Sequence, residues 1–298
     1  MTLLTCAAVG CGERGKPAAS TPDRCFLMTQ YGASQAEAER ALPASQWFTL
    51  MLYGYQPTGA ITRPATDCSW RRIEWTADRC AAWPEPATTL PLQLQSPSDL
   101  VIQSLGDDRR LVWAITERYS DGQAEGAVAL TQFTPQGIRV VTLGTLRAHA
   151  IRPKLRLEAL NSGAILVAEG ESCAVPQDST SCVRTARLVP IVGDRFVPVD
   201  LTDGASKCQG STLLLLKGQG KNLQHGRRAY QFESGLTFRP DGLAVHEQLA
   251  VEERQPDGGG TFLRRVQSDR MIYLQGAALQ TSAPSLLDRW ANARRAAQ

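Results

Sequence analysis

The stretch AVALTQFTPQGIRVVTL, residues 127–143, decides the fold class of this chain. Two β-prone and largely apolar segments, residues 127–133 and 138–143, flank the tetrapeptide Thr134-Pro135-Gln136-Gly137. Proline at the second position and glycine at the fourth position are what a type I turn prefers. Two strands joined by so short a turn become antiparallel neighbours, so the stretch predicts a β-hairpin.

Hairpins of the same kind follow one another along most of the chain. Further turn signals between apolar segments are Ser120-Asp121-Gly122, Gly193-Asp194, Arg239-Pro240-Asp241-Gly242 and the glycine-rich residues 255–260. We therefore expect residues 95–280 to form a mainly β domain of repeated antiparallel hairpins, in a meander, sandwich or propeller-like arrangement.

Three of the expected hairpins share a pattern that bears on the architecture. The similar units begin at Leu130, Leu188 and Leu236, at spacings of roughly 50 residues, which suit the blades of a β-propeller. A small propeller needs at least about four blades, and any succession of hairpins produces similar echoes. A non-repetitive meander, sandwich or open barrel is therefore the favoured alternative.

The region before the hairpins has a different character. Residues 25–90 are expected to form a small α+β region stapled by disulfides. Ser34-Gln35-Ala36-Glu37 fits a capping box, and Pro43 should end the helix that it begins. The expected elements are a helix over residues 35–42 and strands over residues 46–55 and 69–76.

Two further segments are a proline-rich boundary and a predicted C-terminal helix. Four prolines within residues 83–98 predict an extended boundary between the N-terminal region and the hairpins. Residues 284–298 are predicted to form a C-terminal helix with one apolar face. This face can dock on a membrane surface, on an envelope partner or on the protein's own core. Its members are Leu286, Leu287, Trp290 and Ala293.

Composition excludes several classes of function. The chain has 298 residues, 43% of them hydrophobic, which is enough for a sizeable core. A net charge of +3, with no basic run interleaved with aromatic residues, argues against a nucleic-acid partner. No stretch approaches the roughly 18–20 continuous apolar residues that cross a bilayer as a helix. We also expect no cofactor, because no cofactor-binding motif occurs.

The most informative residue for location is Cys11. It follows Ala8-Val9-Gly10 and a short apolar lead, and it precedes a charged, turn-rich segment. This arrangement resembles the processing site of bacterial lipoproteins, where small residues precede a cysteine that is diacylated and becomes the mature N-terminus. The leader is short and has no basic residue, so we expect residues 1–24 to be a truncated signal followed by a flexible tether. The resemblance implies export and lipid attachment in the bacterial cell envelope, in the periplasm or at the outer membrane.

The other cysteines fit an exported protein. Eight cysteines occur, and if Cys6 leaves with the leader and Cys11 is acylated, six remain for three disulfides. A metal site is not expected, because no C-x-x-C occurs and no histidine has zinc-ligand spacing from a cysteine. Free buried thiols are the other alternative. Local spacing and elimination predict the bridges Cys68–Cys80, Cys173–Cys182 and Cys25–Cys208.

Candidate catalytic residues are few. His246 and its acidic neighbours form the only cluster of groups able to exchange protons near neutral pH. Period-two alternation places Glu247 on the other face of the strand, whereas Glu252 can share the face of His246 if the strand runs unbroken. His246 and Glu252 are therefore the catalytic candidates, against a surface histidine with a cross-strand partner.

We accordingly expect a non-catalytic, exported, lipid-anchored envelope protein that binds or scaffolds. One alternative is an envelope hydrolase acting on glycan or peptide, and the other is an accessory subunit of a membrane-associated assembly. Aromatic residues in the N-terminal third either line a groove for a glycan or peptide or fill a core. They are Trp47, Tyr53, Tyr55, Trp70, Trp75 and Trp83.

Overall fold

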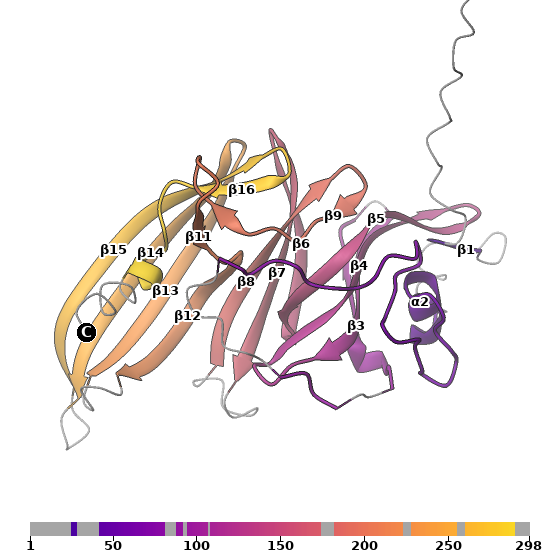
Figure 1. Ribbon diagram of the computed structural model, residues 1–298, viewed down its shortest axis with the longest axis horizontal. Helices are drawn as coiled ribbons and strands as arrows, with labels where there is room; N and C mark the ends of the chain where they lie inside the picture. Colours follow the sequence, from indigo (N-terminus) through magenta and orange to yellow (C-terminus); the bar gives the residue numbers. More distant parts are fainter. Residues whose placement is uncertain are drawn as a thin grey trace, which may run out of the picture.

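In the computed structural model the chain is mainly β, as predicted (Figure 1). The structure describes residues 25–28, 42–80, 88–91, 94–106, 108–173, 182–222, 228–254 and 260–289. The helical elements are α2 (Ala44–Met51), the 3-10 helix η2 (Pro97–Asp99) and a turn at residues 286–289. The strands are β1 (Phe26–Met28), β2 (Leu100–Ser104), β3 (Arg109–Arg118), β4 (Gln123–Thr134), β5 (Gly137–His149), β6 (Ile151–Leu160), β7 (Gly163–Cys173), β8 (Cys182–Val192), β9 (Arg195–Phe196), β10 (Leu201–Thr202), β11 (Cys208–Gly210), β12 (Leu213–Asn222), β13 (Arg228–Arg239), β14 (Gly242–Arg254), β15 (Gly260–Gln275) and β16 (Ala278–Thr281).

The strands of the described chain form one connected sheet of 16 strands. Sequential antiparallel pairing runs through β2–β5, β6–β8 and β12–β16, so the hairpin signals are confirmed. Short β9 hydrogen-bonds to β5 on one side and to β8 on the other, which links the first meander to the others. A propeller would divide into separate blades. One hydrogen-bonded path joins these strands, so the architecture is a long, curved meander.

The central strands bury residues on both of their faces, so parts of the meander pack on one another as layers. On β3, Val112 belongs to the core shared with α2, whereas the next residue, Trp113, belongs to the core shared with β6–β8. On β7, Leu166 packs toward β3, and Val167 packs toward β12–β16. Because neighbouring strand residues point to opposite faces, each central strand serves two cores. The layers are α2, β2–β5, β6–β8 and the curved β12–β16 lobe.

The segment predicted as a strand over residues 46–55 is instead mostly helical. Its apolar residues Trp47, Phe48, Leu50 and Met51 fall on one side of α2 and are buried against β3–β5. Burial of this apolar face outweighs the β propensity of the aromatic residues. Pro43 directly precedes this helix as its N-cap. The helix expected over residues 35–42 lies outside the described residues.

Residues 69–80, which we call the strap, cross the molecule from the α2 end toward β11 (Figure 1). The strand expected over residues 69–76 is absent from this described segment, apart from an isolated bridge at Arg72. Backbone N–H groups of the strap instead donate hydrogen bonds to side chains from other parts of the chain. The Trp75 N–H donates to Glu125 Oε1 at 3.0 Å, and the Cys80 N–H donates to Asp200 Oδ1 at 3.3 Å.

The course of the strap explains why two predicted disulfides are wrong. Cys173–Cys182 forms as predicted and closes the β7–β8 hairpin. The strap does not turn back on itself, so it carries Cys80 away from Cys68. The observed bridges are therefore Cys25–Cys68 and Cys80–Cys208, in place of Cys68–Cys80 and Cys25–Cys208. The second of these covalently joins the N-terminal region to the hairpins.

The predicted C-terminal helix begins within the described chain, at residues 286–289. Leu286 is buried against Phe232 and Leu249, so this first turn docks on the protein's own sheet. The residues from 290 onward lie outside the described part. Among the described residues, no helix has the length and apolar character needed to cross a membrane.

Candidate functional site

The structure does not bring the two predicted catalytic residues together. His246 Nδ1 lies 2.7 Å from Asp269 Oδ1 across β14 and β15, and both side chains are exposed, at 56% and 83%. Glu252 is six residues further along β14, which corresponds to roughly 20 Å. His246 is therefore a surface residue with a cross-strand partner, the alternative that the sequence left open.

Glu247 lies on the opposite face of β14, as the alternation predicted, and is buried. It forms an ion pair with Arg270, which donates from Nε to Oε1 at 3.1 Å. Its other oxygen, Oε2, accepts the backbone N–H of Leu286 at 2.6 Å. A buried carboxylate thus holds the start of the C-terminal helix, where exposed amides favour a negative charge.

A second polar cluster joins the strap to the sheet. Arg187 on β8 is fully buried and donates to both oxygens of Asp78, at 2.6 and 2.9 Å. Its guanidinium also lies 4.6 Å from the centre of the Trp75 ring. Burial raises the pKa of Asp78, but the charge and hydrogen bonds of Arg187 outweigh this and hold that pKa below its usual value. All three guanidinium nitrogens of Arg187 donate hydrogen bonds to protein acceptors. The cluster therefore fixes the strap to the sheet.

A pair of carboxylates lies beside this cluster. Glu117 and Glu125 are direct cross-strand partners on β3 and β4. The Tyr119 hydroxyl lies 2.9 Å from Glu125 Oε2 and 3.4 Å from Glu117 Oε2, so the two carboxylates are within about 6 Å of each other. Burial raises the pKa of Glu125, and hydrogen bonds from Tyr119 and Trp75 only partly oppose this.

The environments of the two carboxylates differ. Glu117 accepts a hydrogen bond from Arg63 at 3.2 Å and lines a hollow of about 380 Å3 that opens to solvent. Glu125 is buried, and both of its oxygens accept hydrogen bonds. Two carboxylates in different environments are the groups that acid–base catalysis uses. No sequence motif marked this pair, because the carboxylates meet only through the register of two strands.

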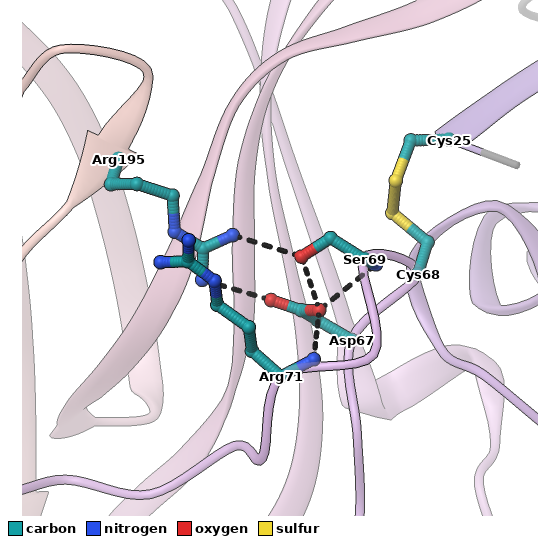
Figure 2. Close-up of a disulfide and its surroundings, with 6 residues drawn as sticks. All are labelled: Cys25, Asp67, Cys68, Ser69, Arg71 and Arg195. Atoms are coloured by element: carbon teal, nitrogen blue, oxygen red, sulfur yellow. Dashed lines mark hydrogen bonds and ion pairs between the residues drawn. A yellow bond between two sulfur atoms is a disulfide. The ribbon is translucent and has the colours of Figure 1, made fainter. Parts of the chain in front are cut away.

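A third feature is a rigid loop that carries an aromatic pair. Figure 2 shows Asp67 at its centre. Asp67 Oδ1 accepts the backbone N–H groups of Ser69 and Arg71 at 2.9 and 3.0 Å, and Oδ2 pairs with Arg195 at 3.0 Å. The Cys25–Cys68 disulfide fastens the same loop from the other side (Figure 2). The loop is therefore fixed by a buried charge, by backbone hydrogen bonds and by a covalent bridge.

This loop holds Trp70 in an uncommon backbone conformation, with φ at +68°. Positive φ is a genuine outlier for a bulky residue and costs about 1–3 kcal/mol. The Trp70 ring lies on the Tyr53 ring with centroids 3.8 Å apart, and the two residues are 49% and 40% exposed. Of the aromatic residues noted in the sequence, these two thus stand at the surface, whereas Trp47 is buried in the core.

A hollow of about 640 Å3, including its open mouth, lies between β6–β8 and β12–β13. Glu169 lines this hollow and accepts hydrogen bonds from Arg156 at 3.1 Å and from Arg184 at 2.5 Å. Burial raises the pKa of Glu169, but these arginines outweigh it and keep the pKa below its usual value. The other lining residues are Leu216, Lys217, Glu233, Ser234 and Leu236.

No family model, curated protein or solved structure matches this chain. The function is therefore argued from the residues and their geometry.

Proposed function

We propose that this is an exported protein, attached to a bacterial envelope membrane by lipid on Cys11, that binds or scaffolds a partner without catalysis. The observation that carries the proposal is the use of the cysteines. Six of the eight form three disulfides, and Cys6 and Cys11 lie outside the described residues. Disulfides persist in oxidising compartments, which supports export independently of the leader.

The disulfides also fit a scaffolding role. Cys80–Cys208 joins residues 128 positions apart and closes the longest loop of the three. Chain entropy alone makes such a bridge worth roughly 5 kcal/mol. Together with the buried Arg187–Asp78 pair, it fixes the strap across the layers. A rigid body that needs no reducing environment suits a protein that presents a surface outside the cytoplasm.

For the bound partner, we propose the hollow between β6–β8 and β12–β13. Its two leucines and its arginines provide both apolar area and fixed charges, the combination that orients ligands in pockets. Lys217 is exposed at its rim and forms no ion pair with another described residue. In Figure 1 the β12–β16 lobe lies at the far end of the molecule from β1 and α2, near which the Cys11 tether must enter.

Metabolic labelling tests the lipid. The protein would be produced from its own gene in its own bacterium, alongside a Cys11→Ser variant, in medium containing an alkyne-tagged fatty acid. We expect the native protein to carry the tag and to sediment with membranes, and the variant to do neither. A native protein without the tag, or a variant that is still labelled, would contradict the proposal.

The carboxylate pair supports a second candidate function, hydrolysis of an envelope glycan or peptide. Glu125 would supply the proton and Glu117 the carboxylate, with Tyr119 between them. Incubation of the purified protein with peptidoglycan, followed by chromatography of released fragments, decides between the two functions. Release that stops in Glu125→Gln supports the hydrolase; no release from either protein supports a binding role.

A further inference from the structure

The exposed Tyr53–Trp70 pair lies where the proposed lipid tether joins the folded protein. Cys25 is the first described residue of the chain, and its disulfide partner Cys68 is two residues before Trp70. The Tyr53 N–H donates to Thr66 O at 3.0 Å, which brings Tyr53 to the same loop. Arg71 and Arg72 follow Trp70 directly, and both are exposed.

We propose that Tyr53, Trp70, Arg71 and Arg72, which we name the anchor-side patch, contact the surface of an anionic phospholipid bilayer. The inference rests on the proposed function, because it takes the membrane to be the one that holds the lipid on Cys11. The patch orients the protein on that membrane. The curved β12–β16 lobe lies at the opposite end of the molecule from α2, which ends two residues before Tyr53 (Figure 1).

Chain length limits where the membrane can be. Cys25 follows Cys11 by 14 residues, and a fully extended chain of that length spans at most roughly 50 Å. The disulfide then transfers this restraint from Cys25 to Cys68. The loop that carries the patch is therefore covalently bridged to the first described residue after the tether, and the patch lies within reach of the bilayer.

The chemistry of the patch fits this surface. Tryptophan and tyrosine are enriched at membrane interfaces, because their rings have an apolar body and a polar edge. Arginines beside them attract anionic headgroups. Among the described residues, Arg72 pairs only with Glu74, at 3.4 Å between two exposed side chains, a weak interaction that headgroups can replace. Arg71 forms no ion pair with another described residue.

The strain at Trp70 is consistent with such a contact. A backbone that holds a bulky residue at positive φ persists only where its surroundings fix it, and here Asp67, Arg195 and the Cys25–Cys68 bridge do so. A core role does not account for this, since the ring is half exposed. The loop instead presents the ring to the outside at low cost in side-chain entropy.

The test uses the full chain with Cys11→Ser, exported to an oxidising compartment, so that no lipid contributes to binding. Partition onto sucrose-loaded vesicles of phosphatidylethanolamine and phosphatidylglycerol is measured by sedimentation. Two variants of this chain alter the patch, Tyr53→Ser with Trp70→Asn and Arg71→Gln with Arg72→Gln. The matched control is Phe262→Ser with Arg265→Gln, because that exposed ring and its arginine, 5.6 Å apart, lie on β15 in the distal lobe.

We expect the parent chain to bind these vesicles, each patch variant to bind at least about fivefold more weakly, and the control to stay within twofold. Equal thermal midpoints of the four proteins exclude unfolding as the cause. The proposal is overturned if the parent does not bind, or if the control loses as much affinity as the patch variants.

A second measurement does not depend on loss of binding. Brominated phospholipids should quench part of the parent's tryptophan fluorescence, and Trp70→Phe should remove the quenched part while the protein still binds. Unchanged quenching in Trp70→Phe would overturn the contact. These outcomes are independent of fatty-acid labelling, which alone decides whether Cys11 carries lipid.

Discussion

Arg187 Nη1 and Nη2 donate to the two carboxylate oxygens of Asp78 at 2.6 and 2.9 Å, and the guanidinium is fully buried. This pair joins β8, at the centre of the sheet, to the strap that crosses it. A buried charge is tolerated only while its partner is present. The position of the strap, and with it the Cys80–Cys208 bridge, depends on this contact.

Removal of the Asp78 carboxylate should therefore destabilise the protein strongly. We expect Asp78→Ala to lower the free energy of unfolding by about 3–5 kcal/mol, because Arg187 is left buried without a counter-ion. The matched control is Arg79→Ala, which removes an exposed guanidinium from its contact with Asp200 and should cost at most about 1 kcal/mol. Urea denaturation of both variants measures the difference; equal losses would mean that Arg187 finds another partner.

Burial lowers the pKa of His149, whose Nδ1 lies 2.7 Å from Thr185 Oγ1. The unfolded chain then binds more protons than the folded chain below about pH 6.5, so stability falls as the pH drops through this value. His149→Asn should flatten this part of the stability profile. Thermal midpoints between pH 7.5 and pH 5 decide this, and identical slopes in parent and His149→Asn would refute it.

Glu125 should behave in the opposite way, because burial raises its pKa. The folded chain binds the proton more tightly than the unfolded chain, so ionisation as the pH rises above about 4.3 lowers stability until the folded pKa is passed. Glutamine can keep both hydrogen bonds without the charge. We expect Glu125→Gln to match or exceed the parent in stability at pH 7, with the advantage shrinking toward pH 4. Calorimetry over this range would disprove the idea if the variant were less stable at pH 7.

The disulfides should contribute according to the loops they close. Replacement of Cys80 and Cys208 by alanine should cost about 2 kcal/mol more than replacement of Cys173 and Cys182, since the loops span 128 and 9 positions. Denaturation of the two double variants tests this order. Peptide mapping without reduction checks the pairing itself, and a fragment that links Cys68 to Cys80 would contradict the observed bridges.

The C-terminal helix should depend on Glu247. In Glu247→Ala the Leu286 N–H loses its acceptor and Arg270 loses its buried partner, so we expect a loss of about 3–5 kcal/mol. Cleavage after residue 286 by a protease should become faster in this variant and stay unchanged in His246→Ala. Cleavage at the parent rate would show that Leu286 packing alone holds the helix.

Local signals predicted the hairpins well, because a turn such as residues 134–137 and the flanking strands are encoded within a few positions. The same locality made Cys173–Cys182 predictable. The strand predicted over residues 46–55 was wrong, because burial of one apolar face against β3–β5 made most of this segment helical. Residues far away in sequence supply that surface.

The polar sites were hidden for the same reason. Asp78 and Arg187 are 109 positions apart, and Glu117 and Glu125 meet only because a register shift after Ile115 sets them opposite each other. His246 attracted attention by its residue type, yet its surroundings are solvent and one exposed carboxylate. Residue types suggest which chemistry is possible. The strand register and the path of the strap decide which side chains come into contact.

The proposed function requires that the mature protein is exported and carries lipid on Cys11. Intact mass spectrometry of the protein purified from its native membrane tests this most directly. We predict a chain that begins at Cys11, carries the mass of a diacylglyceryl group and has its six later cysteines oxidised. A chain that retains residues 1–10 and carries no lipid would contradict the account.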